Sequence, residues 1–435
     1  MQSKLLQATW GSDLHSITDE LETHQAEHKD NDQFHSKVLQ AERQQSSLSG
    51  DESLVYQQSL NQLKKVYAEL LSLSTKRLCD LHALHDFATV ATDELDWLSA
   101  NENIELNRDW SDTSMDLSAL NHNYKQMVSE FNDREHHMRA AMEKGEGLVA
   151  SHPASKLVAQ YMQEIQEQRS WIFQLIHCFE VHFKNLAEFQ NFYNDIGEQK
   201  EWLVARKELL ETKYSDSDFN LDRGDILLRG MQTILDELNQ FGAIVDKLAK
   251  RSQSILPLTE RKQLIHNKQY AVQSLCTYKQ DENILLEKGE VGELLDISPQ
   301  MHWRVRTAKG GEKIIPSVCL SIPPPSDEAM DLVNKLRLSQ QKMIELWQKK
   351  QIQLRRNMIL ATIRVVKEWS FEHFLGLGYE QRNAIRRALN EDSNKVLAES
   401  DPSDRQLSHL KQEMIEINRL FDEFERRANS EGKFN

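Results

Sequence analysis

The sequence predicts a mainly α-helical protein: an elongated rod of tandem three-helix repeats, with one small β-barrel inserted in the third repeat. Long stretches without glycine or proline indicate the helices, and the run from about residue 53 to 107 contains neither. Residues 266–325 differ, because they hold five of the eight prolines and four of the fifteen glycines. Short β-rich segments bounded by turn residues also lie there. This stretch therefore predicts the barrel.

The composition limits the kinds of partner and site. A net charge of −15 argues against nucleic acid or an anionic membrane surface as the main partner, since both attract cations. No apolar run approaches ~18 residues and no signal peptide opens the chain, so we expect a cytoplasmic protein without direct membrane insertion. The four cysteines are widely spaced, which favours a reducing compartment over a disulfide framework. We expect neither a metal nor a cofactor.

Helix start and stop signals order the elements before the barrel. Trp110-Ser111-Asp112 predicts one helix start and Ser151-His152-Pro153 another, while Gly145 and Gly147 predict the end of the helix between them. The helix that follows Pro153 carries two interleaved rows of residues seven apart, one of which includes His182. Such rows are typical of a bundle seam. The expected helices cover about residues 12–46, 53–107, 110–147 and 153–214. A turn at Ser215–Asn220 then leads into a helix that stops at Pro257.

An aromatic pattern indicates the length of the repeat. Phe87 precedes Trp97 by ten residues, and the same pattern returns at Trp202, 105 residues later. That period fits three antiparallel helices of about thirty residues each. Trp369 follows Trp202 by 167 residues, which exceeds the period by 62, the size of the predicted barrel. We therefore expect the barrel between the second and third helices of a repeat.

Three helices are expected after the barrel. Ser326-Asp327-Glu328 has the composition of a helix N-terminus. No glycine or proline follows until Gly376, so we expect one long helix to about His373. A shorter helix should cover Tyr379 to about Glu399, and a last one should reach Phe424.

Several motifs resemble those of one protein family. They are Asp109-Trp110-Ser111-Asp112, His152-Pro153-Ala154, Arg169-Ser170-Trp171-Ile172, Cys276-x-Tyr278, Ile315-Pro316-Ser317-Val318-Cys319 and Ile322-Pro323-Pro324-Pro325. Triple-helical repeats of this length, with a Trp in the first helix, resemble spectrin repeats. A barrel inserted between the second and third helices of such a repeat resembles the SH3 domain of the plakin family.

The resemblance implies five domains. The first would be a spectrin repeat that lacks most of its first helix, and the third would be split by the SH3 domain. The implied ranges are 1–84, 85–188, 189–265 plus 324–357, and 358–435 for the repeats, and 266–323 for the SH3 domain.

The barrel resembles an SH3 domain that has lost its peptide site. Peptide-binding SH3 domains hold proline-rich ligands between aromatic ridges. On that pattern Cys276, His302 and Cys319 stand where aromatic residues would contact the ligand, while Tyr278 and Pro316 are retained. The resemblance implies that this degenerate peptide face packs against a neighbouring spectrin repeat. The residues expected in the SH3 core are Leu275, Leu286, Trp303, Val305 and Ile315.

The remaining candidates have a structural and a functional interpretation each. Cys276 and Cys319 share a predicted barrel face, so a redox pair is one interpretation, although two reduced thiols are the commoner outcome. The histidine pairs lack the spacing of a helical zinc site. The basic run from Arg382 to Arg387 fits a solvated helix face better than an anion site. The tryptophans expected in the repeat cores are Trp97, Trp171, Trp202, Trp347 and Trp369.

No catalytic motif is present, so we do not expect an enzyme. The resemblance implies a structural linker that connects membrane proteins of cell junctions or hemidesmosomes to intermediate filaments or other cytoskeleton. Its expected partners are junctional receptors or their adaptors, and tension is expected to expose the SH3 face. Two alternatives stay open. One is an adaptor whose SH3 domain binds proline-rich ligands at rest, and the other is a spacer with a vestigial SH3 domain.

Overall fold

The computed structural model describes residues 5, 8–47, 50–215, 220–265, 268–280, 283–307, 310–401 and 404–431. The chain divides into two compact units. The first comprises Met1–Leu186 and Leu258–Pro323, and the second comprises Ala187–Pro257 and Pro324–Asn435. Helices dominate both units, and the described strands belong to the first. The predicted fold class, mainly α-helical with one small β-barrel, is confirmed.

Long helices form most of the first unit. They are α2 (Leu14–Gln33), α3 (His35–Gln45), α4 (Asp51–Leu106), α5 (Leu117–Ser151) and the first part of α6 (Ser155–Thr212). The range of α4 agrees with the stretch that lacks glycine and proline, and α6 runs through the one glycine in its range, Gly197. One core of this unit joins α2, α4 and α6, and its buried residues are Ile17, Leu84, Phe87, Ala88, Ala91, Ala154, Val158 and Ile165.

The predicted bounds of α5 are wrong at both ends. The helix begins at Leu117 and not at Trp110, because Asp109 and Asp112 accept hydrogen bonds from the backbone N–H groups two residues on and so hold the chain in turns. The helix also continues past Gly145. A Cβ at that position would lie 2.7 Å from Met162 Sδ, so the glycine allows close packing inside the helix and does not end it.

The second unit contains the rest of α6 with α7 (Leu221–Ser252), α8 (Asp327–Lys367), α9 (Phe371–Gly376), α10 (Tyr379–Glu399) and α11 (Arg405–Glu431). The predicted end of α8 near His373 is wrong: the helix stops at Lys367, and Ser370 caps α9 by accepting a hydrogen bond from the His373 backbone N–H. The range predicted for α10 is correct. Residues 402 and 403, predicted to precede the last helix, lie outside the described residues.

A buried cluster joins the last four helices of the second unit. Trp369 and Phe424 pack against it as partly buried neighbours. The buried members of the cluster are Ile359, Ile363, Val366, Phe374, Leu389, Val396, Leu410, Met414, Ile417 and Phe421.

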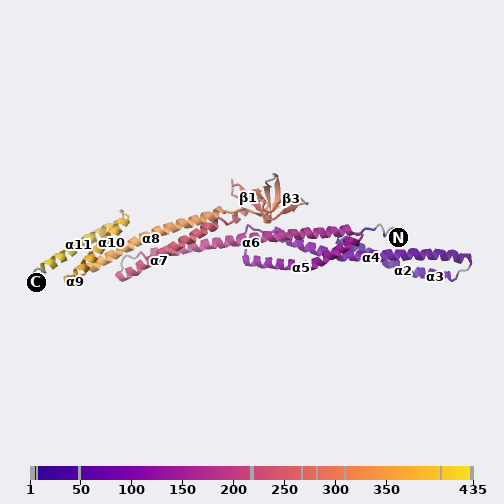
Figure 1. Ribbon diagram of the computed structural model, residues 1–435, viewed down its shortest axis with the longest axis horizontal. Coiled ribbons are helices and arrows are strands. Elements are labelled where there is room, and N and C mark those ends of the chain that lie inside the picture. Colours follow the sequence, from indigo (N-terminus) through magenta and orange to yellow (C-terminus); the bar gives the residue numbers. More distant parts are fainter. Residues whose placement is uncertain are drawn as a thin grey trace. The chain divides into compact units, whose positions relative to one another are not determined.

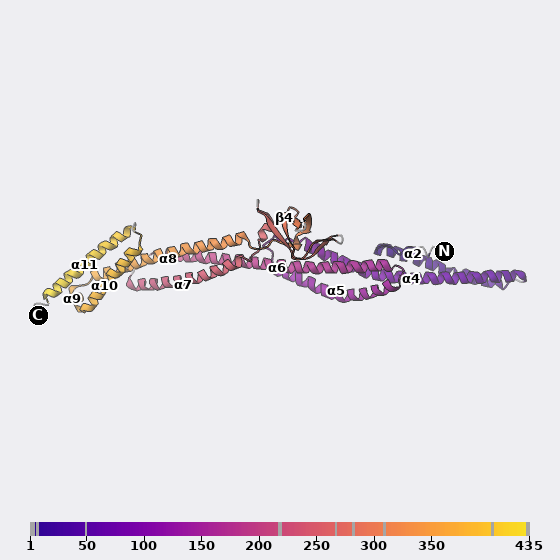
Figure 2. The ribbon, with the colours of Figure 1, turned by 45° about the horizontal axis from the view of Figure 1, so that its top comes forward.

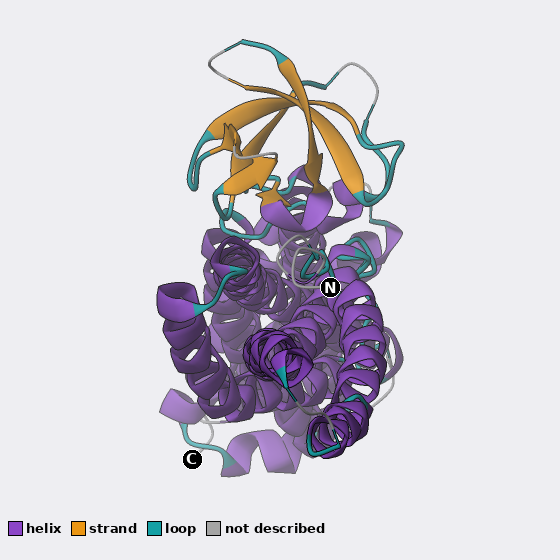
Figure 3. Cartoon of the chain, turned by 90° about the vertical axis from the view of Figure 1, so that its right-hand side faces the viewer, coloured by secondary structure: helices purple, strands orange, loops and turns teal. Residues whose placement is uncertain are grey.

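The barrel follows a short helical turn, η1 (Leu258–Arg261), and contains seven strands in the described residues. Five form an antiparallel sheet in the order β6-β5-β4-β1-β7, and β2 pairs with β3. Figure 3 shows the strands curving around one another. The turn η2 (Ser317–Cys319) connects β6 to β7. The strands are β1 (Tyr270–Ser274), β2 (Tyr278–Gln280), β3 (Asn283–Leu286), β4 (Val291–Asp296), β5 (His302–Thr307), β6 (Glu312–Pro316) and β7 (Leu320–Ser321).

One glycine lets two strands of the barrel approach closely. A Cβ at Gly292 of β4 would lie 2.9 Å from the carbonyl oxygen of Arg306 on β5, so a larger residue would push the strands apart. Residue 266, where we predicted the barrel to begin, lies outside the described residues. Within the part of the chain that the structure describes, no helix is both long and apolar enough to cross a bilayer.

Candidate functional site: the interface between the barrel and helix α6

One face of the barrel packs on the part of α6 that belongs to the first unit. Figures 1 and 2 both show the strands beside this helix. At one end of the contact, the Thr277 backbone N–H donates a hydrogen bond of 2.9 Å to Gln174 Oε1. The ring of Tyr278 lies 5.6 Å from that of Trp171, centroid to centroid. Trp171 also donates from Nε1 to Glu102 on α4, at 2.7 Å.

Two turns along α6, His182 makes the contact at the other end. Its Nε2 lies 2.8 Å from the Val318 carbonyl oxygen, so Nε2 carries the proton and donates. The ring is buried and stacks on Trp110 at 5.0 Å. Burial, with a smaller contribution from the nearby Arg261 charge, lowers the pKa of His182 to about 3. The imidazole is therefore neutral at physiological pH, which suits a donor to a carbonyl group.

Arg261 connects η1 to the end of the barrel. Its guanidinium donates hydrogen bonds of 2.8 Å to the carbonyl oxygens of Leu320 and Ser317 and lies over the Trp303 ring, 4.4 Å from the centroid. Burial lowers the pKa of Arg261 to about 9, an effect that Asp109 partly opposes. The side chain thus satisfies two buried carbonyl groups at the base of the barrel.

Three cysteines meet at the centre of the interface. Cys276 and Cys319 come from the barrel and Cys178 from α6, between Gln174 and His182; all three are reduced and buried. Each thiol lies close enough to the other two to affect their pKa values. The contacts with the other two thiols, and the charges of His177 and Lys288, lower the pKa of Cys276 to about 4. The contact with Cys276 raises the pKa of Cys178.

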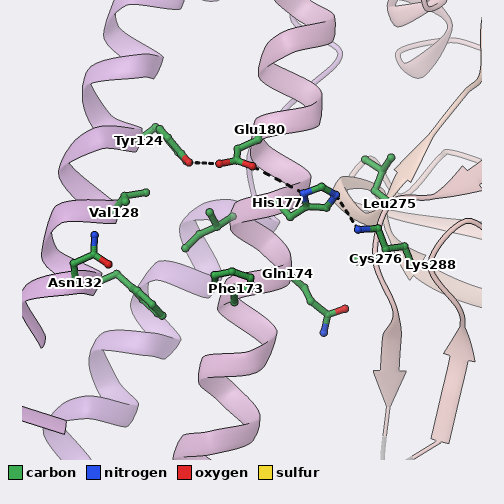
Figure 4. A pocket seen from close by; sticks show the side chains of 12 residues that line it. Tyr124, Val128, Asn132, Phe173, Gln174, His177, Glu180, Leu275, Cys276 and Lys288 are labelled. Carbon is green, nitrogen blue, oxygen red and sulfur yellow. Dashed lines mark hydrogen bonds and ion pairs between the residues drawn. The ribbon is translucent and has the colours of Figure 1, made fainter. Parts of the chain in front are cut away.

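A groove of about 400 Å³ opens beside these thiols, between α5, α6 and the barrel (Figure 4). Cys276 lies on its wall. Lys288 Nζ is 3.1 Å from His177 Nε2, and the other imidazole nitrogen of His177 is 3.9 Å from Glu180. Apolar side chains also line the groove, among them Val128, Phe131, Phe173 and Ile176.

The structure places the predicted peptide-face residues in two groups. Cys276, Tyr278 and Cys319 lie at the α6 interface. His302 is exposed on β5 and Pro316 is buried opposite it on β6. The role of this face stays a prediction.

Most residues predicted for the SH3 core are buried: Leu286, Trp303, Val305 and Ile315. Leu275 differs, because it is half-buried and lines the groove. Its backbone N–H is bonded to the Cys319 carbonyl group at the interface, which places the residue at the edge of the barrel.

The predicted core tryptophans also differ from one another. Trp347 is buried and donates to the Met231 carbonyl oxygen at 2.8 Å. Trp97, Trp202 and Trp369 are half-buried and pack on Phe131, Phe241 and Phe421 respectively. Trp171 is half-buried as well and faces Tyr278 of the barrel, and its assignment to a repeat core stays a prediction.

Sequence reasoning missed Cys178, Gln174 and His182 as interface residues. The sequence held one signal for them. Together with Trp171 these residues are spaced three or four positions apart, so they share one face of a helix. The spacing of seven residues instead predicts a bundle-seam position for His182. In the described ranges, no group of three or more His, Cys, Asp or Glu side chains could hold a metal ion.

Three family models match the chain. The SH3 domain model covers residues 257–323, a spectrin-like repeat model covers 190–256, and the spectrin repeat model covers 82–177. The predicted domain boundaries stay predictions.

Curated relatives extend the match to most of the chain. Microtubule-actin cross-linking factor 1 of Homo sapiens is 31% identical over 410 residues, which is 93% of this chain and 6% of that protein. The Mus musculus protein of that name, isoforms 1/2/3/4, is 30% identical over the same shares. Desmoplakin-A of Danio rerio is 28% identical over 66% of this chain and 14% of its own length. The chain thus spans only a small part of these relatives.

A solved structure has the same fold. A rigid four spectrin repeat fragment of the human desmoplakin plakin domain aligns with a TM-score of 0.70 over 97% of this chain and 95% of that chain, at 22% identity. The predicted family is confirmed: the chain is a plakin-family segment of spectrin repeats with an SH3 domain.

Proposed function

We propose that the chain is a structural segment of a cytoskeletal linker that connects membrane proteins of cell junctions or hemidesmosomes to intermediate filaments or other cytoskeleton. The names of the relatives support this role, since one is a microtubule-actin cross-linking factor and another a desmoplakin. Its partners are proteins, junctional receptors or their adaptors, and its location is the cytoplasm at such junctions. The segment works as a scaffold and not as an enzyme.

The SH3 domain, in this proposal, does not bind proline-rich peptides at rest. The supporting observation is the interface with α6, where Cys276 and Cys319 are 1% and 0% exposed and Tyr278 packs on Trp171. A proline side chain needs open aromatic surface to bury its ring. Here two of the positions carry thiols, and the retained tyrosine already has an aromatic neighbour.

A peptide titration of the full chain tests this part of the proposal. We expect no binding of a PxxP peptide in the micromolar range, whereas an SH3 domain with its aromatic ridges intact serves as the positive control. Micromolar binding by the full chain would support the resting-state adaptor instead.

The mechanical part of the proposal is that tension releases the barrel from α6 before the repeats unfold. Long helices that continue across the proposed repeat boundaries, such as α4 and α6, support it. Single-molecule pulling on the full chain should show an early barrel-release event. Trp171→Ala should lower the force of that event, and Val204→Ala, which shortens a side chain of α6 that is 66% exposed and does not line the groove, should not. Release and repeat unfolding in one event would contradict the proposal.

A vestigial SH3 domain is the remaining alternative. If the barrel were only a spacer, deleting residues 266–323 would leave thermal stability and cell adhesion unchanged. We expect the deletion to lower the stability of the first unit, because it uncovers the buried side chains of Cys178 and His182.

A further inference from the structure

The three-thiol cluster at the interface has a geometry that none of the functions above uses. Cys178 lies on α6 one turn after Gln174 and one turn before His182, and these two residues contact the barrel at Thr277 and Val318. Thr277 follows Cys276 in the chain, and Val318 precedes Cys319. The Leu275 backbone N–H donates to the Cys319 carbonyl oxygen at 2.8 Å and so connects the two barrel segments. The backbone on both sides therefore holds the Cys178 thiol against the two barrel thiols.

Cys276 differs from the other two thiols in two ways: small reagents can reach it, and positively charged groups lie near it. It lines the groove of about 400 Å³, so a small reagent has a route to it, whereas Cys178 and Cys319 are not part of the groove lining. His177 and Lys288 stand on the same side of the groove (Figure 4). Positive neighbours and hydrogen-bond donors favour the thiolate, which is the form that reacts with oxidants.

Cys178 is the thiol best placed to react next. Gln174, one turn before Cys178 on α6, accepts a hydrogen bond from the backbone N–H of Thr277, the residue after Cys276. A Cys276 to Cys319 bond would join two segments of the barrel, whereas a Cys178 to Cys276 bond joins the barrel to α6. We propose that oxidation joins Cys178 and Cys276 in a disulfide that fixes the SH3 domain on α6. This inference goes beyond the linker function and needs only the arrangement within the first unit.

The formation of a disulfide from two thiols needs a two-electron oxidant, and the oxidant in this proposal is a hydroperoxide. The Cys276 thiolate attacks one peroxide oxygen, the O–O bond breaks, and the other oxygen leaves and takes up a proton, which gives a Cys276 sulfenic acid and water or an alcohol. Cys178 then attacks that sulfur. The S–S bond forms, the S–O bond breaks, and the departing hydroxide takes the Cys178 proton as water. Two thiols lose two electrons and two protons, and the peroxide is reduced.

Thiol mapping of the full chain tests the proposal. Hydrogen peroxide is added to the native protein, remaining thiols are blocked, and peptides are mapped without reduction. We expect free thiols to fall from four to two, with one linked pair that contains Cys178 and Cys276. Dithiothreitol should reverse the change. A Cys276 to Cys319 bond as the main product, or oxidation confined to the exposed Cys79, would overturn the proposal.

Two variants and a second readout separate the disulfide from a folding defect. Cys178→Ser should lose the linked pair, and Cys79→Ser, the matched control on an exposed helix position, should keep it. Cys319 stays free in the oxidised wild type and reports on release of the barrel. Its labelling by a maleimide in mild urea should slow by roughly tenfold or more after oxidation. An unchanged labelling rate would overturn the claim that the disulfide fixes the domain.

Discussion

His182 gives the interface between α6 and the barrel a defined pH dependence. The buried ring has a pKa of about 3 in the folded chain, below the ~6.5 of an unfolded histidine. Below about pH 6.5 the unfolded chain binds a proton that the folded chain does not, so the unfolded state gains stability as pH falls. The free energy of unfolding of the first unit should therefore decrease by up to about 1.4 kcal/mol for each pH unit between about 6.5 and 3.

Denaturant unfolding between about pH 7.5 and 5.5 measures this slope, in a range where most carboxylates stay ionised. His182→Gln keeps a donor for the Val318 carbonyl group and lacks the titrating ring, so it should flatten the slope. His15→Gln is the control, since the side chain of His15 is 90% exposed. A slope that His182→Gln leaves unchanged would refute the assignment.

Arg261 should contribute more to the stability of the barrel than any exposed arginine. Arg261→Met leaves two buried carbonyl groups without a donor and should cost about 2–4 kcal/mol of unfolding free energy. Arg304→Met is the control, because its ion pair with Asp296 is half in solvent and should be worth less than about 1 kcal/mol. Equal losses in the two variants, measured by denaturant unfolding, would argue against the buried contact.

At the scale of elements, alanine substitutions at two glycines of α5 should change the free energy of unfolding in opposite directions. A Cβ at Gly145 would lie 2.7 Å from Met162 Sδ and 2.9 Å from Phe87 Cε2, whereas a Cβ at Gly147 would have no neighbour within 4 Å. Gly145→Ala should cost about 1–3 kcal/mol through overpacking. Gly147→Ala should gain up to about 1 kcal/mol through helix propensity. Thermal unfolding of both variants checks the pair, and a stabilised Gly145→Ala variant would show that α5 does not pack as described.

Helices were predictable from the sequence where their signals were local. The absence of glycine and proline predicted α4, and the rows of residues seven apart predicted that α6 continues past its one glycine, Gly197. The glycine before α10 and the serine after it predicted the bounds of that helix. The start of α5 was wrong because Asp109 and Asp112 look like helix caps but bond to their own turns. The end of α8 was wrong because a serine, Ser370, separates it from α9 without any glycine or proline.

The candidate site was predictable only on its barrel side. Cys276 and Cys319 stood out because they replace aromatic residues of a known pattern. Cys178 did not, because a single cysteine in a helix reveals nothing until its partners are known, and those partners follow about a hundred residues later in the chain. Its contact with them depends on which face of α6 the barrel covers, a long-range choice that periodicity cannot supply.

At the scale of the whole chain, the barrel contacts described above all involve residues of the first unit. Val305→Ala, which opens a cavity in the barrel, should therefore speed amide exchange in β5 and β6 and leave the cluster around Leu410 and Met414 unchanged. Ile417→Ala should do the reverse. Hydrogen-exchange mass spectrometry distinguishes the outcomes, and faster exchange of both units in either variant would contradict the division.

The labelling rate of Cys178 tests most directly whether the SH3 domain packs on α6. A bulky maleimide is added to the full chain under reducing, native conditions. Exposed Cys79 should react at once. Cys178, which the barrel covers, should react more slowly than Cys79 by a factor of about a hundred or more. Labelling of Cys178 at the rate of Cys79 would mean that the barrel does not cover α6, and would contradict the account.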